Sequence, residues 1–341
     1  MTTILHTPAA AVAPGSSQPA AAIEAHDLVK TFKTKSGVNR AVAGVDLVVQ
    51  PGTVYGVLGP NGAGKTTTVR MLGTLLRPDS GSAKIFGYDV VRHPTAVRSL
   101  VGLTGQYASV DENLTAVQNL MVFGRLLGLS RKQARARTGE LLDEFSLTKA
   151  ADRPLKDFSG GMRRRLDLAA SLIATPPLLF LDEPTTGLDP RTRAQMWDTI
   201  RQLVAQGTTV LLTTQYLDEA DQLADRIAVI DHGRVIADGT ADELKSSIGT
   251  STLQLTPMDR DDAVRAAGII EKILGETSTL NPEAARITAP MRRPDLLADV
   301  LLALRADGIA VDEMNVQKPT LDEVFLAITG DDHTTSEETN Q

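Results

Sequence analysis

The stretch GPNGAGKTT, Gly59 to Thr67, decides the fold class of this chain. It follows the apolar run TVYGVL and opens a segment that we expect to be helical from Lys65 to about Leu76. The pattern GxxxxGK[ST] between a strand and a helix is typical of a phosphate-binding loop, because bare backbone N–H groups and the helix N-terminus attract phosphate oxygens. The stretch therefore predicts an α/β fold of the P-loop type that binds a nucleoside triphosphate.

Within this loop each side chain has an expected partner. Lys65 is expected to reach the β- and γ-phosphates, and the Thr66 hydroxyl is expected to bind Mg²⁺. The residues expected to surround the phosphates are Gly59, Pro60, Asn61, Gly62, Ala63, Gly64, Lys65, Thr66 and Thr67.

The rest of the first 250 residues alternates between strands and helices. The runs LLFLD, TTVLLTT and RIAVIDHG are continuously apolar, as in a parallel sheet covered on both faces. Helices are expected from Arg193 to Gln206 and from Leu217 to Ala224. Residues 23–50 predict an antiparallel β subdomain, and apolar residues at helical spacing over 116–145 predict a helical subdomain at about 114–175.

Charge divides the chain into two units. The net charge is −7, but residues from Ser251 onward hold 17 acidic and 8 basic residues, so the first 250 carry about +2. We predict a large domain at 23–249 and, after a short linker GTSTL, a small C-terminal α+β domain at 250–330, between disordered tails at 1–22 and 331–341. In PTLDEVFLAI, four apolar residues at helical spacing predict a core face: Leu321, Val324, Phe325 and Ile328.

Several classes of function are excluded by composition. The absence of cysteine excludes disulfides and thiolate metal sites. No apolar run approaches the ~18 residues of a membrane span. The nearly neutral large unit argues against a nucleic-acid partner, which needs a concentrated basic surface.

The run LLFLDEP supplies two acidic residues after a buried strand. Asp182 is placed to hold Mg²⁺, and Glu183 to orient or deprotonate an attacking water. An isolated Asp-Glu pair would be a surface turn, but a pair that follows an apolar strand downstream of a phosphate loop favours a catalytic site.

The stretch FSGGMRRRLDLAASLI, Phe158 to Ile173, permits two interpretations. Ser159, Gly160 and Gly161 could offer a hydroxyl and bare N–H groups to an anion, or simply begin a helix. The three arginines after them suggest nucleic acid, although such a triplet is more often a solvated or ion-paired face.

In combination these motifs resemble the ATPases of ATP-binding-cassette (ABC) transporters. GPNGAGKTT, GLTGQ, FSGGM, LLFLDEP and TTGLD occur in the order and spacing of that family over about Ile23 to Leu244. DENLT, FGRLLGLS, TTQYLDEAD and PTLDEVFLAITG are similar to the ATPase subunits of daunorubicin/doxorubicin-resistance exporters.

The resemblance implies further roles. Phe32, which by itself would be assigned to the core, matches the aromatic residue that stacks on adenine. Gln106 matches the residue that reaches Mg²⁺ and the attacking water. Ser159, Gly160 and Gly161 match the signature that grips the γ-phosphate, and Asp189 matches the loop that crosses to a second subunit.

The resemblance also implies partners. If the signature closes on ATP held by another copy, a chain with one of each motif needs a second copy of itself in a C2 dimer. A separate transmembrane permease of ABC-2 type would make this chain a peripheral protein at the cytoplasmic face of the membrane, powering export of a drug-like, antibiotic or lipid-like compound. The alternatives are a soluble cassette ATPase acting on ribosomes or nucleic acid, and a regulatory module without useful turnover.

Gln215 departs from the general pattern of that family. The strand that contains Thr209 to Thr214 normally leads into a histidine that contacts the γ-phosphate. An amide can donate one hydrogen bond to phosphate and accept another from water, but it cannot become cationic. We interpret Gln215 as a phosphate contact rather than a helix cap, with turnover that shows no histidine titration.

Overall fold

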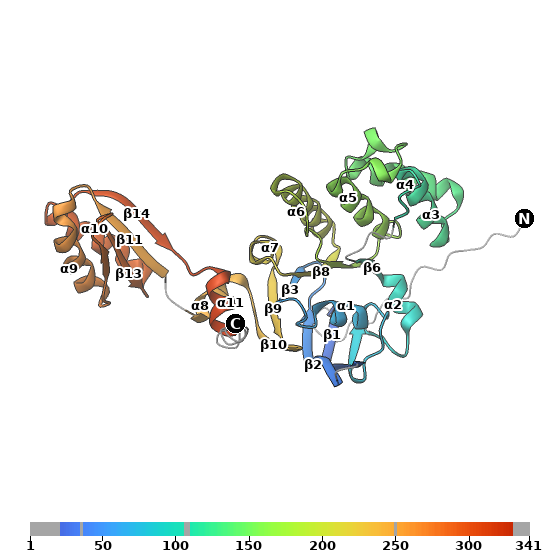
Figure 1. Ribbon diagram of the computed structural model, residues 1–341, viewed down its shortest axis with the longest axis horizontal. Helices are drawn as coiled ribbons and strands as arrows, with labels where there is room; N and C mark the ends of the chain where they lie inside the picture. The colour runs from blue at the N-terminus through green and yellow to red at the C-terminus, as the bar shows by residue number, and fades with distance from the viewer. Residues whose placement is uncertain (1–20, 35–36, 106–109, 249–250, 330–341) are drawn as a thin grey trace, which may run out of the picture.

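The computed structural model describes residues 21–34, 37–105, 110–248 and 251–329 (Figure 1). Gln106 and almost all of the two expected tails lie outside these residues. Ala22, expected in the N-terminal tail, is instead fully buried, and its amide donates to the carbonyl of Val49.

A mainly parallel sheet forms the centre of the larger body, in the order β10-β9-β3-β8-β7-β6. Its strands are β3 (Val54–Leu58), β6 (Val101–Thr104), β7 (Leu178–Asp182), β8 (Thr209–Thr214), β9 (Arg226–Asp231) and β10 (Arg234–Gly239). Every residue of β3, β7 and β8 is buried. This burial on both faces explains their uninterrupted apolar sequences, and β10 is the antiparallel edge.

An antiparallel sheet covers one side of the central sheet, in the order β2-β1-β4-β5. It contains β1 (Ile23–Thr34), β2 (Gly37–Val49), β4 (Ser80–Ile85) and β5 (Tyr88–Asp89). Helices α1 (Lys65–Leu72) and α2 (Pro94–Leu100) lie on the same side (Figure 1). One apolar core joins Leu28 of β1, Met71 of α1 and Phe180 of β7. The expected antiparallel subdomain is therefore packed directly on the phosphate-loop helix.

The helix after the phosphate loop is shorter than the sequence suggested. It ends at Leu72 rather than near Leu76, because Thr74 takes a left-handed φ of 60°. The amides of Leu75 and Leu76 then bond back to the carbonyl of Arg70. This closure ends a helix whose apolar pattern would otherwise continue.

Helices cover the other side of the central sheet (Figure 1). They are α3 (Ala116–Leu126), α4 (Arg131–Glu144), α5 (Gly160–Ser171), α6 (Pro190–Ala205) and α7 (Leu217–Leu223). Capping boxes begin α3 at Thr115 with Gln118 and α4 at Ser130 with Gln133. Their buried faces share one core with strands β7 and β8, so the expected helical insert is packed against the strands that position the acidic pair.

The smaller body is an α+β sandwich with the sheet order β12-β13-β11-β14. Its elements are β11 (Ser251–Pro257), α9 (Ala263–Leu274), β12 (Thr279–Asn281), β13 (Arg286–Met291), α10 (Leu297–Ala306) and β14 (Val311–Gln317). Leu253 is fully buried in β11 and pairs with Ala289 and Val316. The interpretation of Ser251–Leu253 as linker was therefore wrong. The strand character of Ser251–Leu253 was hidden because Leu253 is the only apolar residue among them, and the buried positions of β11 alternate as Leu253, Leu255 and Pro257.

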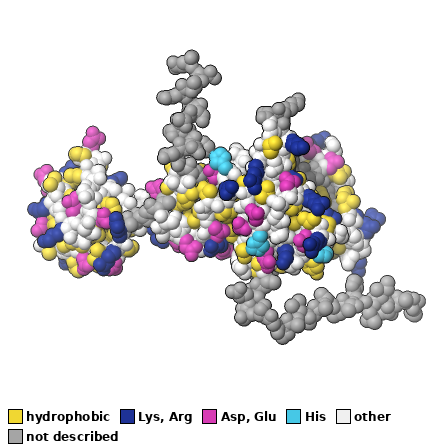
Figure 2. All heavy atoms as spheres, turned by 90° about the horizontal axis from the view of Figure 1, so that it is seen from below, with side chains coloured by type: hydrophobic (Ala, Val, Ile, Leu, Met, Phe, Trp, Pro, Cys, Tyr) yellow, Lys and Arg dark blue, Asp and Glu magenta, His cyan; other side chains and the backbone are white. Residues whose placement is uncertain are grey.

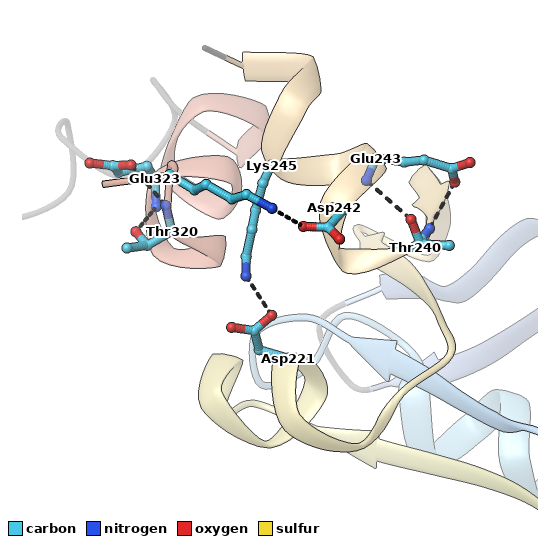
Figure 3. Close-up of polar contacts among 8 residues, drawn as sticks. Asp221, Thr240, Asp242, Glu243, Lys245, Thr320 and Glu323 are labelled. Carbon is cyan, nitrogen blue, oxygen red and sulfur yellow. Dashed lines mark hydrogen bonds and ion pairs between the residues drawn. The ribbon is translucent and has the colours of Figure 1, made fainter. Parts of the chain in front are cut away.

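Two helices that flank the smaller body in the sequence pack against the larger body (Figure 3). They are α8 (Ala241–Ile248), which precedes the smaller body, and α11 (Leu321–Thr329), which follows it. Leu321 and Val324 are buried in a core shared with Leu58 and Ile227. The helical spacing of PTLDEVFLAI thus marks a core face, as expected, but the core belongs to the larger body.

The two helices begin with the same motif, Thr-x-Asp-Glu. In each, the threonine hydroxyl accepts a hydrogen bond from the glutamate amide, and the glutamate carboxylate accepts one from the threonine amide, at Thr240 with Glu243 and at Thr320 with Glu323 (Figure 3). Lys245 of α8 also contacts Asp221 of α7 at 2.6 Å. Within the described residues, no helix has both the length and the apolar character needed to cross a bilayer.

Candidate nucleotide-binding site

The loop from Gly59 to Lys65 is shaped by two glycines. A Cβ atom on Gly59 would lie 2.2 Å from the carbonyl oxygen of Ile230. Gly64 has a φ of 108°, and a Cβ there would lie 2.3 Å from the carbonyl oxygen of Ala41. Both positions therefore require glycine for close backbone approach, and Gly64 also for its left-handed conformation.

Lys65 is buried at the start of α1. Its Nζ donates hydrogen bonds to the carbonyl oxygens of Gly59 at 2.6 Å and Pro60 at 3.0 Å. Burial lowers the pKa of this ammonium, and the carboxylates of Glu183 and Asp182 partly offset that effect. The charge is thus held inside the loop, where a phosphate oxygen can take the place of a carbonyl.

A pocket of about 310 Å³ lies over this loop. The lining residues come from β1, β2, the loop, α1 and the end of β7, and they are Phe32, Asn39, Ala41, Pro60, Asn61, Gly62, Ala63, Gly64, Lys65, Thr66, Thr67 and Glu183. Phe32 is 38% exposed, so part of its side chain is accessible to a planar base. The structure therefore brings Phe32, the phosphate loop and Glu183 to one pocket.

Asp182 ends strand β7 beside the phosphate-loop helix. Its Oδ1 accepts hydrogen bonds from the Thr66 hydroxyl at 3.1 Å and from the Thr213 hydroxyl at 2.5 Å. The carboxylate and the Thr66 hydroxyl are hard oxygen donors of the type that Mg²⁺ binds, so these residues fit the expected metal. Thr213 was missed as a site residue, although a polar residue at the end of an apolar strand is the signal that could have identified it.

Glu183 sits in a strained backbone position. Its φ is 51°, in the left-handed region that residues other than glycine seldom adopt. Its amide donates to the carbonyl and the hydroxyl of Thr213, and its Oε2 accepts a hydrogen bond from the Thr186 hydroxyl at 3.3 Å. Such strain persists only where the surroundings hold it, and it is concentrated at functional sites.

Gln215 follows β8 at the same edge of the sheet. Because Leu58 pairs with Thr214 and Asp182 pairs with Thr213, the chain at Gln215 leaves the sheet between the phosphate loop and Glu183. The residue that precedes α7 is Tyr216, whose amide bonds to the Thr214 hydroxyl. The Gln215 side chain is therefore not the cap of α7, but it is also not among the residues that line the pocket.

The signature segment lies elsewhere on the surface. Ser159 and Gly160 are exposed, and the Ser159 hydroxyl caps α5 by accepting from the amide of Met162. None of the residues from Ser159 to Gly161, nor Asp189, lines the pocket of the phosphate loop. The structure thus separates the expected site residues into two groups.

The signature contacts the segment around Asp189 instead. A Cβ on Gly161 would lie 2.4 Å from Cγ2 of Thr192. The amide and hydroxyl of Thr192 in turn donate to the Asp189 carboxylate at 3.0 and 2.6 Å, and these bonds lower the pKa of that carboxyl. Gly161 therefore has a steric role between α5 and α6.

These features together define the class of protein. A phosphate loop, an acidic pair at the end of the neighbouring strand and an exposed Ser-Gly-Gly helix start on a helical insert are the parts of an ATP-binding-cassette ATPase.

Comparisons with known proteins agree with that class. Residues 42–186 match the ABC transporter family, and residues 239–329 match the family described as ATP-binding protein DrrA1-3-like, C-terminal domain. The chain is 54% identical to the daunorubicin/doxorubicin resistance ATP-binding protein DrrA of Streptomyces peucetius, over 94% of this chain and 97% of that protein. It is 40% identical to the Nod factor export ATP-binding protein I of Burkholderia lata, over 84% and 97% of the two chains.

A solved structure shares the fold of the larger body. The ATP-binding cassette MJ0796, a dimer in a post-hydrolysis state bound to ADP and phosphate, aligns with a TM-score of 0.60 and 25% identity over 64% of this chain and 98% of its own. The chain belongs to the ABC transporter family and, within it, to the DrrA-like ATP-binding proteins. It is an ATP-binding and ATP-hydrolysing subunit.

Proposed function

We propose that two copies of this chain form the ATP-driven engine of an export system at the cytoplasmic face of the membrane. A separate permease, of ABC-2 type, would convert their closure and release into transport. Support for the dimer comes from the separation of the site: the phosphate loop lines one pocket, while Ser159 to Gly161 form an exposed surface outside it. A second copy in C2 arrangement supplies the missing half to each pocket.

The exported compound is proposed from the relatives. The relative at 54% identity is named for daunorubicin and doxorubicin resistance, and a relative at 40% is named for Nod factor export. The higher identity favours a drug-like compound. Recognition of that compound is assigned to the permease.

Each site residue has a proposed role in hydrolysis. Phe32 stacks on the adenine, and Lys65 and the loop amides hold the phosphates. Thr66 and Asp182, with Gln106, would hold Mg²⁺, which supplies charge stabilisation to the phosphates when bound. Glu183 orients or deprotonates the attacking water, while Gln215 contacts the γ-phosphate.

The signature half has its own proposed roles. Ser159 and Gly160 present a hydroxyl and bare N–H groups to the γ-phosphate held by the other copy. Gly161 allows α5 to approach α6, and Asp189 crosses to the second subunit.

The experiment that tests this proposal is phosphate release by the purified chain over a protein concentration series with Mg-ATP. The rate per chain is expected to rise with concentration, and Glu183→Gln is expected to lose steady-state turnover, with only a residual rate measurable in single-turnover assays, while retaining ATP binding. Glu283→Gln, an exposed glutamate of the smaller body, is the matched control and is expected to behave as the parent. A rate per chain that stays constant over the whole series would contradict the composite site.

A further inference from the structure

The three consecutive arginines of α5 have different partners. Arg163 pairs with Glu112 at 2.6 Å and donates to the carbonyl of Leu155, and Arg165 donates to the carbonyl of Phe145. These contacts remain within the helical layer. The triplet is thus not a solvated basic face, and its middle residue differs from both neighbours.

Arg164 reaches out of the helical layer to the edge of the central sheet. Its Nε donates to the carbonyl oxygen of Pro184 at 3.0 Å. One terminal nitrogen, Nη2, donates to the carbonyl oxygens of Asp182 and Glu183, both at 2.9 Å. The other, Nη1, donates to the carbonyl oxygen of Gly105 at 2.7 Å. One guanidinium therefore binds the backbone after β7 and the backbone after β6.

The Arg164 guanidinium is a buried charge whose position is fixed by hydrogen bonds to the backbone. Its side chain is only 13% exposed, and burial lowers its pKa. Its nearest carboxylate oxygen, on Asp167, is 3.7 Å away, so the short contacts are all to neutral carbonyls. Only a planar fork with five N–H donors can bind four carbonyls in this way; a lysine ammonium at the same place has three donors around one point.

These bonds complete the restraint of the Glu183 backbone. The amide of Glu183 is bonded to Thr213 of β8, and its carbonyl is bonded to Arg164 of α5. The strained φ of 51° is thus held from both sides. Because Ser159 to Gly161 begin the same helix, Arg164 also links the signature to the carboxylate.

We propose that Arg164 is a positioning residue for ATP hydrolysis. It holds the Glu183 backbone in the conformation that aims the carboxylate into the pocket, and it fixes that backbone relative to the signature helix. This inference rests on the proposed role of Glu183. It predicts that loss of the guanidinium lowers the rate of the chemical step and leaves ATP affinity unchanged, because the four hydrogen bonds of Arg164 go to the ends of β6 and β7 rather than to the phosphate loop.

The test uses the full chain with Arg164→Lys, and with Arg165→Lys as the matched control on the same helix. For Arg164→Lys, kcat is expected to fall by about tenfold to a hundredfold, the loss that a displacement on the order of 1 Å causes. KM for ATP is expected to stay within about threefold, and Arg165→Lys is expected to keep kcat within about twofold. If kcat of Arg164→Lys stays within about twofold of the parent, or if both lysine variants lose kcat equally, the inference is overturned.

A second pair of measurements separates positioning from general stability and from the role of Glu183. Added guanidinium is expected to restore part of the turnover of Arg164→Ala, whereas methylammonium at equal concentration is not. Equal restoration by both cations, or by neither, refutes the requirement for a planar guanidinium. In single-turnover assays, Arg164→Lys is expected to leave the hydrolysis rate of the Glu183→Gln variant unchanged. If Arg164→Lys lowers that rate by as large a factor as it does in the parent, action through Glu183 is refuted. If Glu183→Gln keeps full turnover, the proposed role of Glu183 itself fails, and this inference fails with it.

Discussion

The methyl group of Thr192 is predicted to leave no room for a side chain at position 161, so that glycine is required there. In Gly161→Ala the new Cβ would lie 2.4 Å from Cγ2 of Thr192, whereas carbon atoms in contact lie ~3.5–4.0 Å apart. Either α5 or α6 must move by about 1 Å, or the Thr192 side chain must rotate and lose its hydrogen bond to Asp189. Overpacking of this kind costs about 1–3 kcal/mol.

The companion change Thr192→Ser removes Cγ2 and keeps the hydroxyl. In the parent, the Thr192 hydroxyl donates to the Asp189 carboxylate at 2.6 Å, and the serine hydroxyl is expected to keep this hydrogen bond. Alanine also gains up to ~1 kcal/mol of helix propensity over glycine, but that gain is the same in both backgrounds and cancels in a double-mutant cycle. The cycle is therefore expected to give a coupling energy of about 1–3 kcal/mol between the two positions.

Urea unfolding followed by Trp197 fluorescence measures this coupling. Trp197 is the single tryptophan of the chain and lies on α6, so the signal follows the larger body alone. Gly161→Ala is expected to lower the midpoint in the parent and to lower it less, or to raise it, with Thr192→Ser. A coupling energy below ~0.5 kcal/mol would refute the steric argument.

The remaining predictions concern titration, turnover and attachment of the smaller body. Glu219 is fully buried, and burial raises the pKa of its carboxyl, so the stability that it contributes is present at low pH and is lost as pH rises. Glu219→Gln is therefore expected to have a higher Tm than the parent at pH 8, and this difference in Tm is expected to disappear toward pH 5. A difference in Tm that grows on acidification would contradict the raised pKa. Gln215→His is expected to give the phosphate-release rate a titration between about pH 5 and 8 that the parent lacks, and unchanged profiles would place this residue away from the phosphate. Leu321→Ala is expected to lower the unfolding free energy by about 2–5 kcal/mol, because the Leu321 side chain is buried between α11 and the larger body. The control is Leu326→Ala, at an exposed residue of the same helix, which should change the unfolding free energy by less than ~0.5 kcal/mol.

The parts of the site that depend on short stretches of sequence could be predicted. The phosphate loop and the acidic pair are each contained in fewer than ten residues, and their strand and helix context is set by neighbouring apolar runs. The P-loop α/β class and the ABC resemblance followed from these local patterns, and both are confirmed.

Contacts between distant segments could not be predicted. Arg164 lies between two other arginines, and nothing in its local sequence distinguishes a guanidinium that binds four carbonyls from one that faces solvent. The hydrogen bond from Thr213 to Asp182 depends on the pairing of β7 with β8, which local sequence does not specify. The early end of α1 depends on one left-handed residue, Thr74, and threonine carries no sequence signal for that conformation.

The two-copy site is tested most directly by mixing two inactive variants. Lys65→Met removes the phosphate contact and keeps the signature, while Ser159→Arg blocks the signature and keeps the phosphate loop. In a mixed dimer, one site receives the intact loop of one chain and the intact signature of the other. Each variant alone is expected to release no phosphate, and an equal mixture is expected to recover up to about a quarter of parental turnover, because half of the dimers are mixed and each contains one intact site.

A mixture of Lys65→Met with the Lys65→Met, Ser159→Arg double variant has no intact loop and serves as the blank. Recovery in the first mixture but not in the blank is the result that the two-copy account predicts. Full turnover by Ser159→Arg alone, or no recovery at any mixing ratio, would contradict it.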